Sequence, residues 1–311
     1  MRPPVIAVTD LVKKYREVTA LAGISLAVAP GTVLAVLGHN GAGKTTLIDI
    51  LSTRIRPSSG TARVCGHDVV RRGRAIRRRI GVTGQFTAVD DALSGRGNLL
   101  LIARLLGAKP AQARARAAEL IASFGLEDAA DRPAGTYSGG MRRRLDLAAG
   151  LVGAPEVLFL DEPTTGLDPV SRAALWNVVE ELAARGTTIV LTTQYLEEAD
   201  RLADHVVVLG LGRITVSGTP AQLKARLGSR TATLTLGSEL TVRRAVDAVS
   251  RLGLSAGRAG LTLTVPLRGP GDITMLVRAL DAAEAPLRDL TVTEPTLDDV
   301  YLSLHTAAAN S

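Results

Sequence analysis

The stretch Gly38-His39-Asn40-Gly41-Ala42-Gly43-Lys44-Thr45 decides how the rest of this sequence is interpreted. Its spacing, G-x-x-x-x-G-K-T, predicts a phosphate-binding loop, and the apolar run Val33 to Leu37 predicts the strand that enters it. Glycines let the backbone curl until successive N–H groups face an anion, and the next helix turns its positive end toward the same anion. We expect Lys44 to reach the β- and γ-phosphates of a nucleotide and the hydroxyl of Thr45 to hold Mg²⁺.

The predicted nucleotide-binding residues of this segment run from the end of the strand into the first turn of the helix. They are Gly38, His39, Asn40, Gly41, Ala42, Gly43, Lys44, Thr45 and Thr46. Apolar residues then recur at helical spacing, which predicts one face buried against a sheet. These residues are Leu47, Ile50 and Leu51.

Two adjacent carboxylates follow a second apolar run, Val157 to Leu160. Four consecutive apolar residues predict a buried strand, and Asp161 at its end is expected to bind Mg²⁺ directly or through water. Glu162, one residue later, is expected to point elsewhere and accept a proton from an attacking water molecule. A pair of carboxylates that only caps a helix is the competing interpretation. It is credible alone but weak beside a phosphate-binding loop.

A third motif, Tyr137 to Arg142, is predicted to open a helix. Ser138, Gly139 and Gly140 would lie at the exposed N-terminus of that helix and form a second anion-binding site. One nucleotide has one γ-phosphate, so two such sites suggest an active site shared by two chains. The predicted buried stripe of the helix consists of Met141, Leu145, Ala148 and Val152.

In this order the three motifs resemble those of the ATP-binding cassette family of ATPases, and the resemblance runs from about Val5 to Leu227. Ser138 to Met141 matches the family signature, usually Leu-Ser-Gly-Gly-Gln, with Tyr137 and Met141 as departures. The resemblance implies that ATP and Mg²⁺ are bound. It also implies a head-to-tail dimer of two copies, in which the signature of one closes on the ATP held by Lys44 of the other.

The same resemblance assigns roles to positions outside the three motifs. Gln85 matches the glutamine that touches Mg²⁺ and the transmembrane subunit, and Tyr15 matches the aromatic residue that stacks on adenine. Residues 166–168 match the loop that communicates between the two sites. Gln194 replaces the usual switch histidine. Its amide can donate and accept hydrogen bonds but does not titrate, so we expect it to sense the γ-phosphate while Glu162 alone acts as base.

Four further phrases resemble the daunorubicin-resistance group of bacterial exporter ATPases. They are Val82 to Gln85, Asp90 to Gly95, Thr192 to Asp200 and Glu294 to Leu302. The similarity implies export of a hydrophobic antibiotic or lipid through a separate transmembrane permease. It also implies a peripheral location on the cytoplasmic side of the cell membrane.

The pattern of apolar runs predicts two domains. Residues 1–228 alternate strands and helices, which favours an α/β core with a phosphate-binding loop, and a helical subdomain is expected at about 88–152. In residues 229–311 the pattern of strands and helices begins again in shorter segments. It predicts an accessory βαβαβα (α+β) domain without a catalytic motif. The strands predicted for the core are Leu21 to Val28, Val33 to Leu37, Ile80 to Thr83, Val157 to Leu160, Thr188 to Thr192 and Val206 to Leu209.

Composition narrows the class of partner. The net charge is +7, and basic residues cluster at 71–74, 77–79 and 142–144. Because aromatic residues for base stacking are almost absent from these clusters, we expect a solvated basic face near anionic lipid headgroups rather than a nucleic-acid partner. Cys65, the one cysteine, is expected to be a buried, inert thiol in a short strand. No apolar run reaches the 18 or so residues that a membrane-spanning helix needs.

Two other functions remain open from the sequence. A cassette ATPase that acts on DNA would carry a long coiled coil, and the segment between Lys44 and Ser138 shows no sustained heptad. One that acts on ribosomes would usually carry two cassettes, and this sequence has a single phosphate-binding loop. A regulatory protein that binds ATP without hydrolysing it would explain Gln194. The presence of Glu162 argues against it, because a degenerate site would more readily have lost its base.

Overall fold

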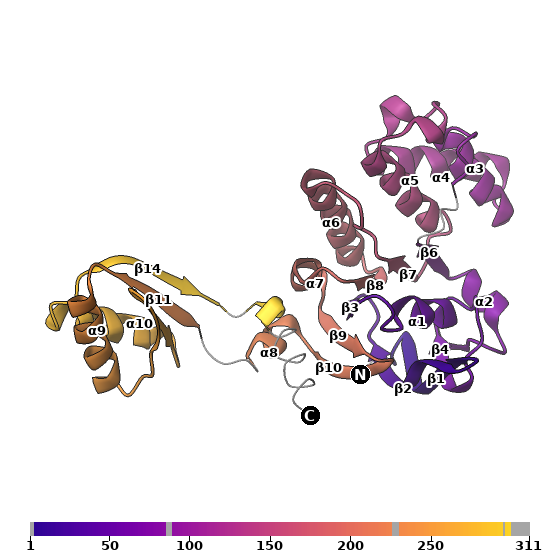
Figure 1. Cartoon of the computed structure of the whole chain (residues 1–311). Helices are drawn as coiled ribbons and strands as arrows, with labels where there is room; N and C mark the ends of the chain where they lie inside the picture. The colour runs from indigo at the N-terminus through magenta and orange to yellow at the C-terminus, as the bar shows by residue number, and fades with distance from the viewer. Residues whose placement is uncertain (1–2, 85–88, 226–229, 295, 300–311) are drawn as a thin grey trace. The chain divides into compact units, whose positions relative to one another are not determined.

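The structure is a computed structural model that describes residues 3–84, 89–225, 230–294 and 296–299. The chain divides into two compact units, Met1–Thr219 and Pro220–Ser311, shown in Figure 1. The expected domain boundary near residue 228 lies a few residues beyond this division and stays a prediction. Gln85 falls outside the described residues.

A six-stranded sheet positions the chemistry of the first unit, in the order β10-β9-β3-β8-β7-β6. The strands β3, β6, β7, β8 and β9 run parallel, and β10 pairs with β9 antiparallel. Their bounds are β3 Val33–Leu37, β6 Ile80–Thr83, β7 Val157–Asp161, β8 Thr188–Thr193, β9 His205–Gly210 and β10 Arg213–Gly218. Since the central parallel strands are buried on both faces, they read as continuous apolar runs. This pattern explains why the strand bounds predicted from the sequence lie close to those in the structure.

The carboxyl ends of the central strands meet at one edge of this sheet. Leu37, the last residue of β3, pairs with Thr193 of β8, and Thr192 pairs with Asp161 of β7. Ligands of open α/β sheets bind outside this edge. The register therefore brings the phosphate-binding loop and the two carboxylates to the same place.

A second, antiparallel sheet has the order β2-β1-β4-β5. Its strands are β1 Ile6–Tyr15, β2 Val18–Val28, β4 Ser59–Val64 and β5 His67–Asp68. Helix α1 (Lys44–Leu51) packs in a core that joins both sheets, and Leu47, Ile50 and Leu51 are fully buried as expected. Cys65 is buried as predicted, in the turn that follows β4 rather than in the strand, and burial raises the pKa of its thiol to about 11.

Helices fill the segment between β6 and β7. They are α3 Gly95–Leu105, α4 Pro110–Ser123 and α5 Gly139–Leu151, with short 3₁₀ turns at Glu127–Ala129 and Ala134–Thr136. In Figure 1 the three helices lie together as one group. Within the helical subdomain expected at about 88–152, the chain breaks between α3 and α4. Helix α5 touches the sheet so closely that a Cβ on Gly81 of β6 would lie 2.1 Å from the carbonyl oxygen of Gly150.

The remaining helices of the first unit, α2, α6 and α7, follow β5, β7 and β8. Their bounds are α2 Gly73–Arg77, α6 Pro169–Ala184 and α7 Leu196–Leu202. Trp176 on α6 donates to Glu198 on α7 through a 3.1 Å hydrogen bond, which ties these two helices together inside the protein. Within the described part of the chain, no helix is both long and apolar enough to cross a membrane.

The second unit begins with helix α8 (Pro220–Ala225) and contains an antiparallel sheet of order β12-β13-β11-β14 with its own apolar core. The bounds are β11 Thr231–Leu236, α9 Glu239–Arg251, β12 Gly257–Ala259, β13 Thr262–Pro266, α10 Pro270–Ala282 and β14 Leu287–Thr293. The short edge strand β12 was not predicted. Of the residues expected to form the accessory domain, 229, 295 and 300–311 lie outside the described part of the chain.

Candidate functional site

The predicted phosphate-binding loop leaves the carboxyl end of β3 and enters α1. Gly41 and Gly43 adopt left-handed φ values of 84° and 105°, which glycine adopts without strain. A Cβ on Gly43 would lie 2.5 Å from the carbonyl oxygen of Ala20, and one on Gly38 would lie 2.8 Å from that of Leu209. The neighbouring strands β2 and β9 therefore exclude any side chain at these two positions.

Lys44 is almost completely buried, and three oxygen atoms surround its ammonium group. Nζ donates to the carbonyl oxygens of Gly38, at 2.7 Å, and His39, at 3.2 Å. It also forms an ion pair with Oε1 of Glu162 at 3.2 Å. A buried cation requires such partners. An incoming phosphate would compete with Glu162 for this ammonium group.

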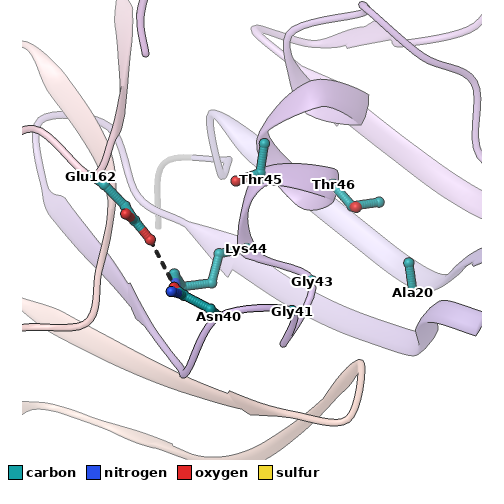
Figure 2. A pocket seen from close by; sticks show the side chains of 8 residues that line it. All are labelled: Ala20, Asn40, Gly41, Gly43, Lys44, Thr45, Thr46 and Glu162. Carbon is teal, nitrogen blue, oxygen red and sulfur yellow. Dashed lines mark ion pairs between the residues drawn. The ribbon is translucent and has the colours of Figure 1, made fainter. Parts of the chain in front are cut away.

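A cavity of about 250 Å³ opens above the loop. Figure 2 shows Glu162 facing Lys44 across it, from a separate stretch of the chain. The concave loop, the N-terminus of α1 and the lysine fit an anion such as the phosphate chain of a nucleotide. The residues that line the cavity are Ala20, Asn40, Gly41, Gly43, Lys44, Thr45, Thr46 and Glu162.

Asp161 and Thr45, two of the predicted Mg²⁺ ligands, lie next to each other. The Thr45 hydroxyl donates to Oδ1 of Asp161 at 3.4 Å, and the Thr192 hydroxyl donates to the same oxygen at 2.5 Å. Asp161 is 5% exposed. Mg²⁺ usually takes only one or two carboxylates and completes its octahedron with water and substrate phosphates. Thr45 and Asp161, two oxygen ligands beside an anion-binding cavity, fit this mode of coordination.

Glu162 is turned toward the cavity by an unusual backbone conformation. Its φ is 49°, in the left-handed region that costs energy for a residue with a side chain. Its N–H group donates to both the carbonyl, at 3.1 Å, and the hydroxyl, at 3.0 Å, of Thr192. The Thr165 hydroxyl donates to Oε2 at 3.4 Å. These bonds fix a carboxylate between the phosphate-binding loop and β8, where a general base would act.

Gln194 follows the end of β8 and is exposed. It does not line the cavity, although the pairing of Thr193 with Leu37 places it at the same sheet edge as the phosphate-binding loop. Tyr15 ends β1, is 45% exposed, and lies under the Lys13 ammonium group, 4.9 Å from the ring centroid. The cavity wall on that side consists of Ala20 rather than Tyr15.

Ser138 caps α5 by accepting a 3.3 Å hydrogen bond from the Met141 N–H group, and it is exposed together with Gly139. Neither Ser138 nor Gly140 lines the cavity. Within one chain the structure therefore brings together the phosphate-binding loop, Asp161 and Glu162, and not the signature. Met141 is only partly buried, so the buried stripe of α5 begins at Leu145.

The prediction that the third basic cluster is a solvated face was wrong. Arg142 forms an ion pair with Asp91, and Arg144 donates to the carbonyl oxygens of Phe124 and Gly125, at 2.9 Å and 3.2 Å. Arg143 donates to the backbone on both sides of Glu162. Three consecutive helical residues spread over about 200° of the helix surface, so the three arginines do not share one solvent-exposed side. That spacing was the available signal.

Known proteins resemble this chain along nearly its whole length. The family model described as "ABC transporter" matches residues 21–165. The daunorubicin resistance ATP-binding protein DrrA3 of Streptomyces coeruleorubidus is 48% identical over 98% of this chain and 96% of its own length. The daunorubicin/doxorubicin resistance ATP-binding protein DrrA of Streptomyces peucetius is 46% identical over 96% and 92%. The solved structure of cbiO1 from Clostridium perfringens, part of the ABC transporter complex cbiONQ, shares 27% identity with a TM-score of 0.65, over 81% of this chain and 98% of that one.

Proposed function

We infer the function of this chain from its family, because it belongs to the ATP-binding subunits of ATP-binding cassette transporters, in the group of the daunorubicin and doxorubicin resistance proteins. It is an ATPase subunit of a drug-resistance exporter. We propose that its cargo is a hydrophobic drug or lipid, which passes through a separate permease. The observation that carries the assignment of the chemistry is the 3.2 Å pair between Lys44 and Glu162 at the mouth of the phosphate-binding loop.

Lys44 and the backbone N–H groups of the loop would bind the β- and γ-phosphates of ATP. Thr45 and Asp161 would hold Mg²⁺, with Gln85 as the further ligand that the family resemblance implies, and the ion would neutralise charge on the phosphates. When the Lys44 ammonium group turns to phosphate, the Glu162 carboxylate loses its partner. It is then free to accept a proton from the attacking water. Nucleotide binding and activation of the base are thus linked through one lysine.

The active site is proposed to need a second copy of the chain. Ser138 and Gly139 present the positive N-terminus of α5 to solvent, outside the cavity of their own chain. In a head-to-tail dimer this helix end would face the γ-phosphate held by Lys44 of the other copy. Residues 166–168 would then carry the state of one site to the other.

A membrane partner is proposed to dock on the helical segment. Three leucines of α3 and the turn after it, Leu101, Leu105 and Leu106, are 45%, 77% and 54% exposed. Large apolar side chains gathered on one surface are typical of an interaction site. We propose that the permease covers them, which would hold this chain at the cytoplasmic side of the cell membrane. No nucleic-acid partner is proposed.

Substitution of the base tests the chemistry. Glu162→Gln should keep ATP binding and lower turnover by about 10²- to 10⁴-fold, because an amide cannot take a proton. An ATP-bound dimer should then accumulate, visible by size-exclusion chromatography with ATP. Lys44→Ala, by contrast, should weaken ATP binding itself by about 10- to 100-fold, since a hydrogen bond to a charged group contributes about 1.5–3 kcal/mol. Near-normal turnover of Glu162→Gln would remove Glu162 from the role of base.

A further inference from the structure

Glu162 keeps its strained backbone because partners hold it on both sides. Its N–H group is bound by Thr192 of β8, at 3.1 Å to the carbonyl and 3.0 Å to the hydroxyl. Its carbonyl oxygen accepts a 3.1 Å hydrogen bond from Nη2 of Arg143 on α5. A non-glycine residue at a φ of 49° persists only where the surroundings over-determine it. The direction of the carboxylate therefore depends on both partners.

The guanidinium of Arg143 spans the whole turn that carries Glu162. Nε donates to the carbonyl oxygen of Pro163 at 2.5 Å, and Nη2 donates to that of Asp161 at 3.3 Å as well as to Glu162. Nη1 approaches the carbonyl oxygen of Gly84, just after β6, at 3.4 Å. One side chain thus binds the backbone before, at and after the base, and also the end of the neighbouring strand.

Only arginine suits this arrangement among the cationic residues. The four acceptors are backbone carbonyls spread around a plane, and guanidinium offers five donors in a rigid planar fork. A lysine ammonium group is a compact charge that cannot reach all four at once. Burial lowers the pKa of Arg143, and the charges of the nearby carboxylates of Asp146, Glu198 and Asp161 oppose this shift.

We propose that Arg143 is a positioning residue for hydrolysis, which holds the turn from Asp161 to Pro163 so that the carboxylate of Glu162 faces the cavity. Arg143 lies on α5, the helix that Ser138 caps. It therefore joins the helix of the signature to the base in the same chain. A shift of α5 would move the carboxylate of Glu162 relative to Lys44. The proposal rests on Glu162 as base.

The test compares Arg143→Gln with Arg143→Lys in the full chain and uses Arg144→Gln as matched control. Arg144 lies on the same helix and also binds two backbone carbonyls, but those belong to Phe124 and Gly125, away from the base. We expect Arg143→Gln to lower kcat by about 10- to 100-fold, the size of effect that a 1 Å misplacement produces. The Kd of ATP should change less than about twofold. The kcat of Arg143→Lys should lie between those of Arg143→Gln and the unsubstituted chain. Arg144→Gln should keep its kcat.

Thermal unfolding separates positioning from general stability. If Arg143→Gln and Arg144→Gln lower Tm alike while only the first loses kcat, positioning is supported. Equal losses of kcat in both would show a merely structural role and overturn the proposal. Should Arg143→Gln fail to fold, the kcat and Tm of Arg143→Lys are compared with those of Arg144→Gln instead.

A double substitution distinguishes this proposal from the proposed function. In a Glu162→Gln background, Arg143→Gln should cause no further loss of turnover, because the group that it positions is gone. A further 10-fold loss there would show that Arg143 acts elsewhere. A Glu162→Gln protein with normal turnover would refute the proposed base. An active Arg143→Gln with an inactive Glu162→Gln would refute only the positioning role.

Discussion

Two adjacent carboxylates of this chain have different surroundings, as the different roles proposed for them require. Asp161 ends β7, accepts hydrogen bonds from the hydroxyls of Thr192 and Thr45, and is 5% exposed. Glu162 leaves the strand with a left-handed backbone and turns toward Lys44. A regular strand would place consecutive side chains on opposite faces of the sheet. The turn instead keeps both carboxylates at the edge where the phosphate-binding loop begins.

Gln194 provides a prediction at the residue scale. Gln194→Ala should lose most of the turnover and keep ATP binding, because it removes the amide that we expect to sense the γ-phosphate and position the attacking water. Gln194→His should stay active, since a histidine ring can also donate. Steady-state ATPase assays and a nucleotide-binding titration measure the two quantities. A fully active Gln194→Ala would make this residue a spectator at the end of β8.

Asp146 on α5 predicts a pH dependence of stability. Burial raises the pKa of its carboxyl to about 6 from 3.8, and Oδ1 has no hydrogen-bond partner among the described residues. The protonated form is therefore favoured in the folded state. Its stabilising effect is fully present below pH 3.8, shrinks as the pH rises toward 6, and is absent above. Ionised Asp146 should cost at most about 3 kcal/mol near pH 7.5, from about 1.4 kcal/mol per pKa unit.

Asp146→Asn tests this dependence through denaturant unfolding at two pH values. The variant should gain stability at pH 7.5 and match the unsubstituted chain near pH 4, where Asp146 is already neutral. The exposed Asp131, whose pKa the hydrogen bond from Arg96 lowers, is the control, and Asp131→Asn should show no such gain. The same gain at both pH values would exclude ionisation as the cause.

At the scale of the element, α5 joins the exposed motif at Ser138 to the turn that carries Glu162. Its N-terminus is open at Ser138, its middle is buried from Leu145, and Gly150 lies against β6. Glycines at 81 and 150 allow this contact, since a Cβ on either would overlap the other element. This close contact fixes where the C-terminal part of α5 lies against β6.

A substitution at the tip of α5 tests the shared site. Ser138→Arg should abolish hydrolysis and leave ATP binding by a single chain nearly intact, because the bulky cation blocks closure on the γ-phosphate of the other copy. Mixed with Lys44→Ala chains, it should regain activity, since one arrangement of the mixed dimer contains one unmutated composite site. Two variants that stay monomeric with ATP in sedimentation, and show no recovery on mixing, would rule out the dimer.

At the scale of the whole molecule, the two units have separate apolar cores. The first core surrounds α1 and both sheets of Met1–Thr219, and the second is built around β11, α9 and β13. We expect a chain ending at residue 228 to keep ATP affinity within about twofold, because every nucleotide-binding residue lies upstream. A titration with a fluorescent ATP analogue measures it. A folded truncation that no longer binds ATP would contradict this boundary.

Some elements of the fold could not be predicted from sequence. Buried and exposed side chains do not alternate regularly along β1, because register shifts interrupt its pairing with β2 at Val8, Leu11 and Lys13. A pattern of period two is lost wherever such irregularities occur. The antiparallel sheet was therefore recognised only in parts, whereas the continuous apolar run of β3 gave that strand its full bounds.

The phosphate-binding loop, the apolar strands that flank it and the helical face of α1 could be predicted from the sequence alone, because these depend on the conformations and spacing of neighbouring residues. The ion pair of Glu162 with Lys44 and the hydrogen bond from Arg143 to the backbone of Glu162 could be seen only in the folded chain. Both contacts join residues far apart in the chain. Their geometry follows from the register of β3, β8 and β7 and from the packing of α5 against β6. Patterns of neighbouring residues in the sequence predict neither.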